Sequence, residues 1–273
     1  MIDLHLHSRA SDGSLRPSEL VQLCAARGVQ LLALTDHDCL TGLPEARSAA
    51  HTAGIRCVNG VEISVTWENK TLHVVGLNIN PQNPELLAGL ARLQATRAVR
   101  AQEIGRRLGV RGIHGAYAGA RALAGNNNVT RTHFAQWLCD QGHAATSQKA
   151  FQRFLDRGKP GYVPTIWASI KESIGWIHAA CGKAVLAHPL RYRLTRAKLM
   201  QALTAFKQAG GDAMEVICGH GNRDDIATAS HYATRFELMI SVGSDFHNPA
   251  SPWNQPGIET LPPENLRPVW ECF

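Results

Sequence analysis

The sequence predicts an α/β fold in which mostly parallel strands form a barrel-like sheet, interrupted by an inserted helical segment. Short apolar, β-branched runs alternate with helical stretches along the 273 residues, the pattern of parallel strands joined by helical crossovers. The strand runs number about seven, which favours a barrel over an open sheet. Residues 100–162 break the alternation with a glycine-punctuated helical pattern. We therefore expect a barrel from residues 1–99 and 163–273, with residues 100–162 as an inserted helical lid.

Local signals place each element in order. Pro17 suits the first turn of a helix, and Gly54 follows a helical stretch as a stop signal. Thr130 in the insertion suits a helix N-cap. The expected strands are Ile2–His7, Gln30–Thr35, Arg56–Ser64, Thr71–Ile79, Lys183–Ala187, Ala213–Cys218 and Leu238–Gly243, the third and fourth being close enough to form a hairpin. The expected helices are Pro17–Arg27, Leu43–Ala53, Pro84–Leu108, Ala168–Cys181, Arg196–Ala209 and Arg223–Arg235.

Composition narrows the class of protein. The chain is 44% hydrophobic and 18% charged, which is ordinary for a globular protein. Seven cysteines, odd in number and never in C-x-x-C spacing, argue against a disulfide framework and fit a reducing cytoplasm. We recognise no signal peptide and no apolar run of membrane-spanning length. The net charge of +6 favours an anionic ligand, although the basic residues are dispersed.

Histidines and acids gather near the carboxyl ends of the expected strands. His5 and His7 alternate on the first strand, so both face one side and can chelate one metal. The rim formed by strand ends is where parallel α/β barrels build active sites. Only the sixth strand, Ala213–Cys218, offers no expected ligand. A single strand histidine is more often a core residue, but the joint pattern predicts a metal site drawn from the imidazoles and carboxylates near the strand ends, namely His5, His7, Asp12, Asp36, His37, Asp38, Glu62, His73, His188, Asp245 and His247.

The chain resembles the PHP (polymerase and histidinol phosphatase) family of metal-dependent phosphoesterases. The resemblance is carried by DLHLHS, SDG, LTDHD, GVEIS, LHVVG, AHP and SDFH. It implies a distorted (β/α)7 barrel with a trinuclear metal site. It further implies one metal on His5, His7, Glu62 and Asp245, a second on Glu62, His73 and His188, and a third on Asp12, His37 and His247.

Imidazole and carboxylate donors suit three divalent ions, with Mn²⁺ expected first and Zn²⁺ or Fe²⁺ as alternatives. Such ions polarise phosphoryl oxygens and activate water. We expect in-line attack by a metal-bridging hydroxide, with no protein nucleophile and no covalent intermediate. Asp36 or Asp38 is expected to orient His37, as carboxylates often do for ligating imidazoles.

The insertion and the later strand exits offer anion contacts. Arginine binds phosphate bidentately and lysine as a point charge. The candidate substrate contacts are Arg131, His133, Arg157, Lys159 and Tyr162 in the insertion, and Arg191, Arg193, His220, Asn222 and Arg223 beyond it. GKPGYVP and the R-x-H segment resemble a stand-alone branch of the family. That resemblance implies a nucleoside 3′,5′-bisphosphate or the 5′ end of a short RNA as substrate, with no stable protein partner.

Three alternatives stay open at this stage. A histidinol-phosphate phosphatase would share the metal site and differ in the lid. A metal-dependent amidohydrolase also begins with H-x-H, but ordinarily bridges its metals with a lysine where this chain has Glu62. A non-catalytic metal-binding interaction module, as in some polymerases, is the third possibility.

Overall fold

The computed structural model describes residues 1–273 except 126–127, 193, 220, 251–253, 261–262 and 264. Within this part of the chain, seven strands form one sheet whose spatial order equals their order in the sequence. Consecutive strands are therefore neighbours throughout, as the alternation of strands and helices predicts. The strands are β1 (Ile2–Leu6), β2 (Leu31–Leu34), β3 (Arg56–Trp67), β4 (Lys70–Leu77), β5 (Lys183–Leu186), β6 (Ala213–Cys218) and β7 (Met239–Gly243).

The sheet curls into a nearly closed barrel, which confirms the predicted fold class. The chain leaving β7 returns to β1, where His7 donates its backbone N–H to Phe246 (3.0 Å) and Asp245 donates to His5 (2.9 Å). A Cβ on Gly243 would lie 2.3 Å from the Cβ of His5, so only glycine allows the two strands to approach this closely.

The β3–β4 hairpin is confirmed, and β4 also pairs antiparallel with β5, while the other neighbours are parallel. The hairpin is longer than predicted because Glu68 and Asn69 form its turn with positive φ of 43° and 62°, a conformation suited to two-residue hairpins. Glu62 consequently lies in the middle of β3 and not at its end. The hairpin extends the barrel wall past the metal-ligand level.

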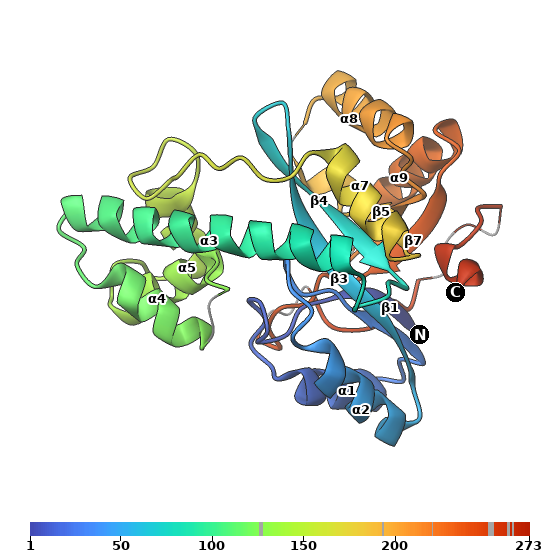
Figure 1. Cartoon of the computed structure of the whole chain (residues 1–273), viewed down its shortest axis with the longest axis horizontal. Coiled ribbons are helices and arrows are strands. Elements are labelled where there is room, and N and C mark those ends of the chain that lie inside the picture. The colour runs from blue at the N-terminus through green and yellow to red at the C-terminus, as the bar shows by residue number, and fades with distance from the viewer. Residues whose placement is uncertain (126–127, 193, 220, 251–253, 261–262, 264) are drawn as a thin grey trace.

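Helices cover the outside of the barrel, as Figure 1 shows. Helices α1 and α2 pack together, and α2 also packs against β3; α7 packs against β3–β5 and α8, and α9 packs against β6 and β7. Gly54 takes the left-handed conformation that ends α2, as its position after the helix predicts. These helices are α1 (Pro17–Ala26), α2 (Leu43–Ala53), α7 (Ile170–Ala179), α8 (Arg196–Gln208) and α9 (Arg223–Arg235), with 3₁₀ turns at Pro189–Tyr192 and Val269–Cys272.

The insertion is built on one long helix, α3 (Pro84–Val110), that begins against the barrel and continues past it (Figure 1). The predicted boundary at residue 100 therefore falls inside a continuous helix. Beyond the barrel, α3 packs with a separate apolar cluster that includes Leu108, Phe134 and Leu155. The remaining elements of the insertion are α4 (Ala116–Ala124), α5 (Arg131–Asp140), α6 (Ser147–Ala150) and a π-helical turn at Phe151–Leu155.

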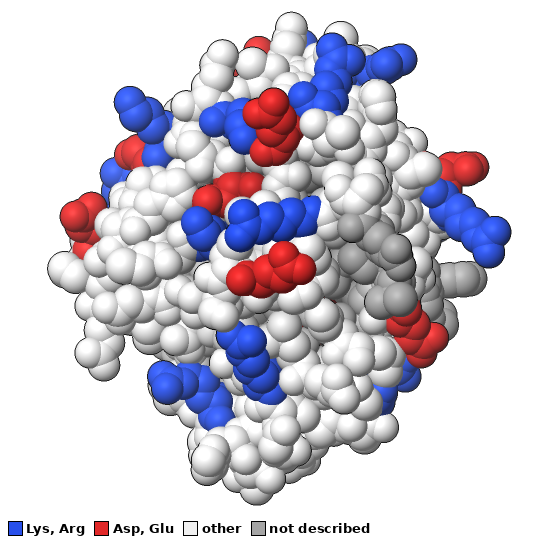
Figure 2. Space-filling model, turned by 90° about the vertical axis from the view of Figure 1, so that its right-hand side faces the viewer, with Lys and Arg blue, Asp and Glu red and all other residues white. Residues whose placement is uncertain are grey.

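Surface charge is mixed on the face seen in Figure 2, where basic and acidic side chains alternate over the barrel side of the molecule. This agrees with the dispersed basic residues of the sequence and offers no long basic track on that face. No helix in the described part of the chain is both long and apolar enough to cross a lipid bilayer.

Candidate metal centre

The nine predicted ligands converge on the inside of the barrel rim. Ligand atoms of His7, Asp12, His37 and His247 lie within 4.8 Å of one another. Three further overlapping groups meet the same limit: His5, His7 and Asp245; His5, Glu62 and His188; and His37, Glu62 and His73. The groups share members with the three sets implied by the family resemblance, although His7 also joins the Asp12 group and His5 joins Glu62 and His188.

Alternation along β1 directs His5 and His7 to the same side. Their Nε2 atoms lie 3.1 Å apart, and both rings are fully buried. Strand pairing also brings His37 opposite Glu62, because the chain leaving β2 continues beside β3. The amide of Asp38 donates to the carbonyl of Glu62 (2.8 Å) and fixes that register.

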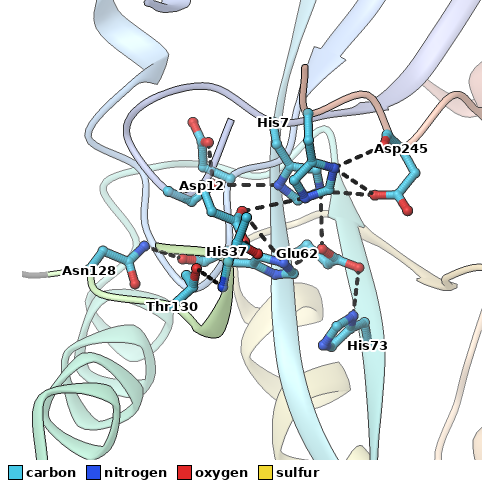
Figure 3. A network of polar contacts seen from close by, with 12 residues as sticks. His7, Asp12, His37, Glu62, His73, Asn128, Thr130 and Asp245 are labelled. Atoms are coloured by element: carbon cyan, nitrogen blue, oxygen red, sulfur yellow. Dashed lines mark hydrogen bonds and ion pairs between the residues drawn. The ribbon is translucent and has the colours of Figure 1, made fainter. Parts of the chain in front are cut away.

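Glu62 is the hub of the cluster, as Figure 3 shows. Its buried carboxylate lies 2.9 Å from Nδ1 of His37 and 3.0 Å from both Nδ1 of His73 and Nε2 of His188. The Nε2 atoms of His5 and His7 are 3.3 and 3.2 Å away. One carboxylate thus bridges imidazoles from four different parts of the barrel, as a bridging metal ligand must.

Asp245 and Asp12 supply the remaining negative charge. Asp245 Oδ1 lies 3.3 Å from Nε2 of His7, and Asp12 Oδ1 lies 3.4 Å from Nε2 of His247. Asp245 and His188 have positive φ of 54° and 30°, a region that costs free energy for residues other than glycine. Such strain is typical of functional sites whose geometry the surrounding fold imposes.

Mutual charge compensation dominates the acid–base properties of the cluster. Burial opposes ionisation of Glu62, but the surrounding imidazoles, His73 and His37 first, hold its pKa well below the usual range. Burial alone would lower the pKa of His7, yet hydrogen bonds to Asp245 and Glu62 raise it to about 10. For His37 the burial effect prevails over the carboxylates and lowers the pKa to about 4. The ionised form of the Glu62 carboxylate is therefore favoured despite its burial.

Orphaned polar atoms show that the residues present fit divalent cations. Among the described residues, Asp12 Oδ1, Glu62 Oε2, His37 Nδ1 and His188 Nδ1 are buried and form no well-directed hydrogen bond, although His37 Nδ1 and Glu62 Oε2 lie 2.9 Å apart as an ion pair. Buried polar atoms are rarely left unpaired in proteins. Imidazole nitrogens and carboxylate oxygens without thiolates form a donor set suited to Mn²⁺, Zn²⁺ or Fe²⁺.

One residue of the cluster, Glu215, was not predicted from the sequence. We expected no contribution from the sixth strand, but β6 places Glu215 inside, where Oε1 accepts from His5 Nδ1 (2.7 Å) and Oε2 from the His188 amide (2.6 Å). A carboxylate on the second nitrogen fixes the ring so that Nε2 faces the cluster. The available signal was an acid in the otherwise apolar strand AMEVIC, since a buried strand carboxylate requires a partner.

Asp36 and Asp38 lie nearby, but their hydrogen bonds go to other residues and not to the His37 ring that we expect one of them to orient. Asp36 accepts from the Ser8 amide and hydroxyl and from the Ser11 hydroxyl (2.6–2.8 Å), so it holds the loop that carries Asp12. Asp38 accepts from the Ser64 amide (2.7 Å) and pairs with Arg97 (2.6 Å). Both carboxylates brace backbone loops, while the His37 ring contacts Glu62 and Asp12.

The insertion contributes a pocket beside the ligands. A cavity of about 100 Å³ lies between Asp12, His37 and His73 on one side and Arg97, Arg100, Arg131, Thr130, Thr132, Phe151 and Trp167 on the other. This equals the share of about three water molecules, enough for a phosphoryl group. Arg131 thus lines a pocket beside the predicted metal ligands, and its contact with substrate stays a prediction. Arg97 and Arg100 also line the pocket, but they belong to a helix face with no distinguishing sequence motif.

Of the three arginines that line this pocket, only Arg97 forms an ion pair among the described residues. Arg97 is bound to Asp38, but Arg100 stacks on Trp167 and its Nε has no hydrogen-bond partner among the described residues. Burial, reinforced by Arg131 and Arg97, lowers the pKa of Arg100 to about 9. Burial likewise lowers the pKa of Arg131. Guanidiniums crowded in this way are stabilised by an anion between them.

The other predicted substrate contacts in the insertion do not all lie at the pocket. Tyr162 lies close enough to Arg100 and Arg131 to affect the pKa of both. Nδ1 of His133 accepts from the Thr130 amide (3.0 Å) in a capping box, which also confirms Thr130 as the N-cap. Lys159, like Arg157, is exposed and does not line the pocket.

Beyond the insertion, Arg191 reaches the metal cluster. It donates to Asp245 Oδ2 (2.7 Å) and to the Cys218 carbonyl (3.0 Å), so it holds a ligand in place. Asn222 caps α9 through the Asp225 amide, and Arg223 is exposed at the same helix start. The predictions for Arg193 and His220 fall outside the described residues.

A seven-stranded barrel with imidazoles and carboxylates converging at its rim defines a metal-dependent hydrolase. Comparison with known proteins refines the class. The PHP domain model matches residues 3–183. The chain is 45% identical over 271 residues to a 3′,5′-nucleoside bisphosphate phosphatase of Chromobacterium violaceum, covering 98% of this chain and 95% of that one. It is 44% identical over 272 residues to a 5′-3′ exoribonuclease of Haemophilus influenzae, covering 99% and 98%.

A solved structure shares this fold over nearly the whole chain. An amidohydrolase from C. violaceum with bound sulfate and no metal superposes with a TM-score of 0.94 at 44% identity, covering 99% of this chain and 94% of that one. The chain belongs to the PHP family of metal-dependent phosphoesterases. It is accordingly a hydrolase of phosphoric esters.

Proposed function

We propose that the enzyme removes the 3′-phosphate of nucleoside 3′,5′-bisphosphates, and acts on the 5′ ends of short RNAs through the same site. One observation carries the proposal: an arginine-lined pocket directly adjoins the metal-ligand cluster. A substrate with two phosphates about one ribose apart can present one to the metals and the other to Arg100 and Arg131. The relatives named for a nucleoside bisphosphate and for RNA act on molecules of this kind.

The nine ligands are proposed to hold three divalent ions, with Mn²⁺ preferred. Bound there, the ions polarise the phosphoryl oxygens and lower the pKa of a water nucleophile, so no protein nucleophile is needed. Glu62 keeps the imidazoles clustered, and Glu215 fixes the tautomer of His5 by accepting from Nδ1. Arg191 holds Asp245 in place. The chain thus contributes ligand geometry, and Arg131 and Arg100 contribute substrate orientation.

The pocket argues against histidinol phosphate as the substrate. That molecule carries one phosphate and a cationic amine, which the neighbouring guanidiniums of Arg100 and Arg131 would repel. A second anionic group matches the pocket instead. All seven cysteines lie unpaired, consistent with a reducing cytoplasm as the place of action, and we propose the nucleotide as the partner without a stable protein complex.

The test is phosphate release in Mn²⁺ from nucleoside monophosphates, adenosine 3′,5′-bisphosphate, 5′-phosphorylated oligoribonucleotides, histidinol phosphate and an aryl phosphate. We expect the bisphosphate to be the best small substrate, yielding AMP. Arg131→Ala should raise KM for the bisphosphate about tenfold to a hundredfold, the range for a lost charged hydrogen bond, and change the aryl phosphate little. Arg121→Ala, exposed on α4, is the matched control. Preference for histidinol phosphate would overturn the proposal.

A further inference from the structure

An open groove of about 490 Å³ runs along the side of α3 and is separate from the metal-ligand cluster. One wall is a stripe of α3 from Arg92 to Glu103, and the other is the segment 163–166, which returns from the insertion to the barrel. Figure 1 shows this segment passing alongside α3 before α7 begins. The volume falls within the range of small-molecule sites.

Exposed apolar side chains mark the groove as a binding surface. Val99 is 69% exposed and Ile166 85%, and they are two of the five large apolar side chains exposed among the described residues. Val163 and Pro164 line the groove beside them. Exposed apolar side chains grouped along a groove are unfavourable in water, and a ligand that covers them removes this unfavourable exposure.

The charges around the groove are paired except at one end. Arg92 bonds to Glu172 (2.8 Å), and Glu103 bonds to Arg106 and Arg107 (2.6 and 2.7 Å). Arg100 lines both the groove and the arginine pocket. The groove therefore carries an apolar strip and shares the cationic side chain of Arg100 with the arginine pocket, which complements a neutral flat group joined to an anion.

We propose that the groove is the base-binding subsite for the nucleotide whose phosphate is held by Arg100 and Arg131. This rests on the proposed function. The pocket itself has room for a phosphoryl group but not for a purine, so the base must lie outside it. Bases bind apolar platforms through their faces without sequence-specific hydrogen bonds, so we expect the groove to accept different bases and to favour purines, which bury more surface.

The test compares two substrates and two variants in Mn²⁺. The substrates are adenosine 3′,5′-bisphosphate and its baseless analogue, tetrahydrofuran 3′,5′-bisphosphate. Val99→Ser with Ile166→Ser should raise KM for the nucleotide about tenfold more than KM for the analogue, because the base loses two aliphatic contacts. Val110→Ser is the matched control, since Val110 is 73% exposed on the same helix but does not line the groove.

The outcomes separate this proposal from the proposed function. Wild-type enzyme that hydrolyses neither bisphosphate refutes the function itself. Wild-type enzyme that hydrolyses both with equal kcat/KM retains the function and refutes a base subsite. Equal KM changes for both substrates in the double variant, or no change in either, also overturn the assignment of this groove.

Discussion

The barrel rim and the helical insertion arrange their charged side chains differently. At the rim, carboxylates and imidazoles from successive strands are buried together and compensate one another around Glu62. In the insertion, arginines such as Arg100 and Arg131 stand close together with little compensation. Strands with fixed register suit ligands that must meet within tenths of an ångström. Helices on a separate core suit a surface that contacts a substrate, so under the proposed function chemistry and substrate selection would reside in different parts of the chain.

The two regions are fastened to each other at His37 and Asp12. Asn128 donates to the His37 carbonyl (2.7 Å; Figure 3), and Thr132 donates its hydroxyl to Asp12 Oδ2 (3.0 Å). Gln94 donates to the Asp38 carbonyl (3.0 Å). The insertion therefore contacts the loops that carry Asp12 and His37. Experiments can test whether destabilising the insertion also disturbs the barrel rim.

The largest effect is expected at the rim. Glu62→Gln removes the charge that five imidazoles face, so we expect a loss in kcat of about 10³-fold or more, because metal-based charge stabilisation is worth several kcal/mol. Metal content, measured by elemental analysis, should fall with activity. A variant that keeps both its metals and its activity would show that Glu62 is not the hub.

A core substitution in the insertion tests whether that region melts separately. Phe134 is fully buried in the insertion cluster, and Phe134→Ala should cost about 3–5 kcal/mol locally. We expect faster amide exchange in α4 and α5, a raised KM for bisphosphates and retained metal content. The matched control, Phe206→Ala, lies in the barrel core and should lower stability across the barrel instead. Loss of metal in the Phe134 variant would mean that the rim depends on the insertion.

Glu215→Gln examines positioning within the rim. The amide keeps the size of the side chain but loses the charge that holds His5, so metal affinity should fall about 10- to 100-fold. Raised Mn²⁺ should restore kcat, which a merely misfolded variant would not show. Glu45→Gln, on α2 and hydrogen-bonded to Ser18, is the comparison variant. Unchanged metal titration curves would assign Glu215 a purely structural role.

Much of this arrangement can be predicted from the sequence, and the exceptions have physical causes. Strand alternation placed His5 and His7 on one face, and the order of strand ends identified the rim. The role of Glu215 could not be predicted, because a buried acid is recognised as part of a site only when its partner across the barrel is known. Arg100 could not be predicted for a similar reason, since the position of its helix face is set only when α3 packs against α7 and the barrel core. Contacts between distant segments are set by packing, which local patterns do not contain.

The smallest effect is expected where the chain returns from the insertion to the barrel. Ser169 caps α7 in a capping box with Glu172, and Ser169→Ala should cost about 1 kcal/mol, or about 2–4 °C in Tm for a chain of this size. The Ser169 amide, then Arg92 and the Ser169 hydroxyl, lower the pKa of Glu172 from 4.5 to about 2. Because the folded pKa is depressed, this stability is present above pH 4.5 and is lost as pH falls toward 2.

Thermal unfolding of metal-free wild-type and Ser169→Ala protein at pH 7 and pH 3 provides the measurement. The Tm difference should be larger at pH 7, although solvent around the half-exposed Glu172 limits the electrostatic share. Thr146→Ala removes the corresponding cap of α6 within the insertion, where no acid joins the cap, so its Tm effect should not depend on pH in this range. If the Tm effect of Ser169→Ala does not depend on pH, the cap acts through its neutral hydrogen bond alone. The α7 cap on the barrel side would then resemble the α6 cap in the insertion, with no measurable contribution from the charge of Glu172.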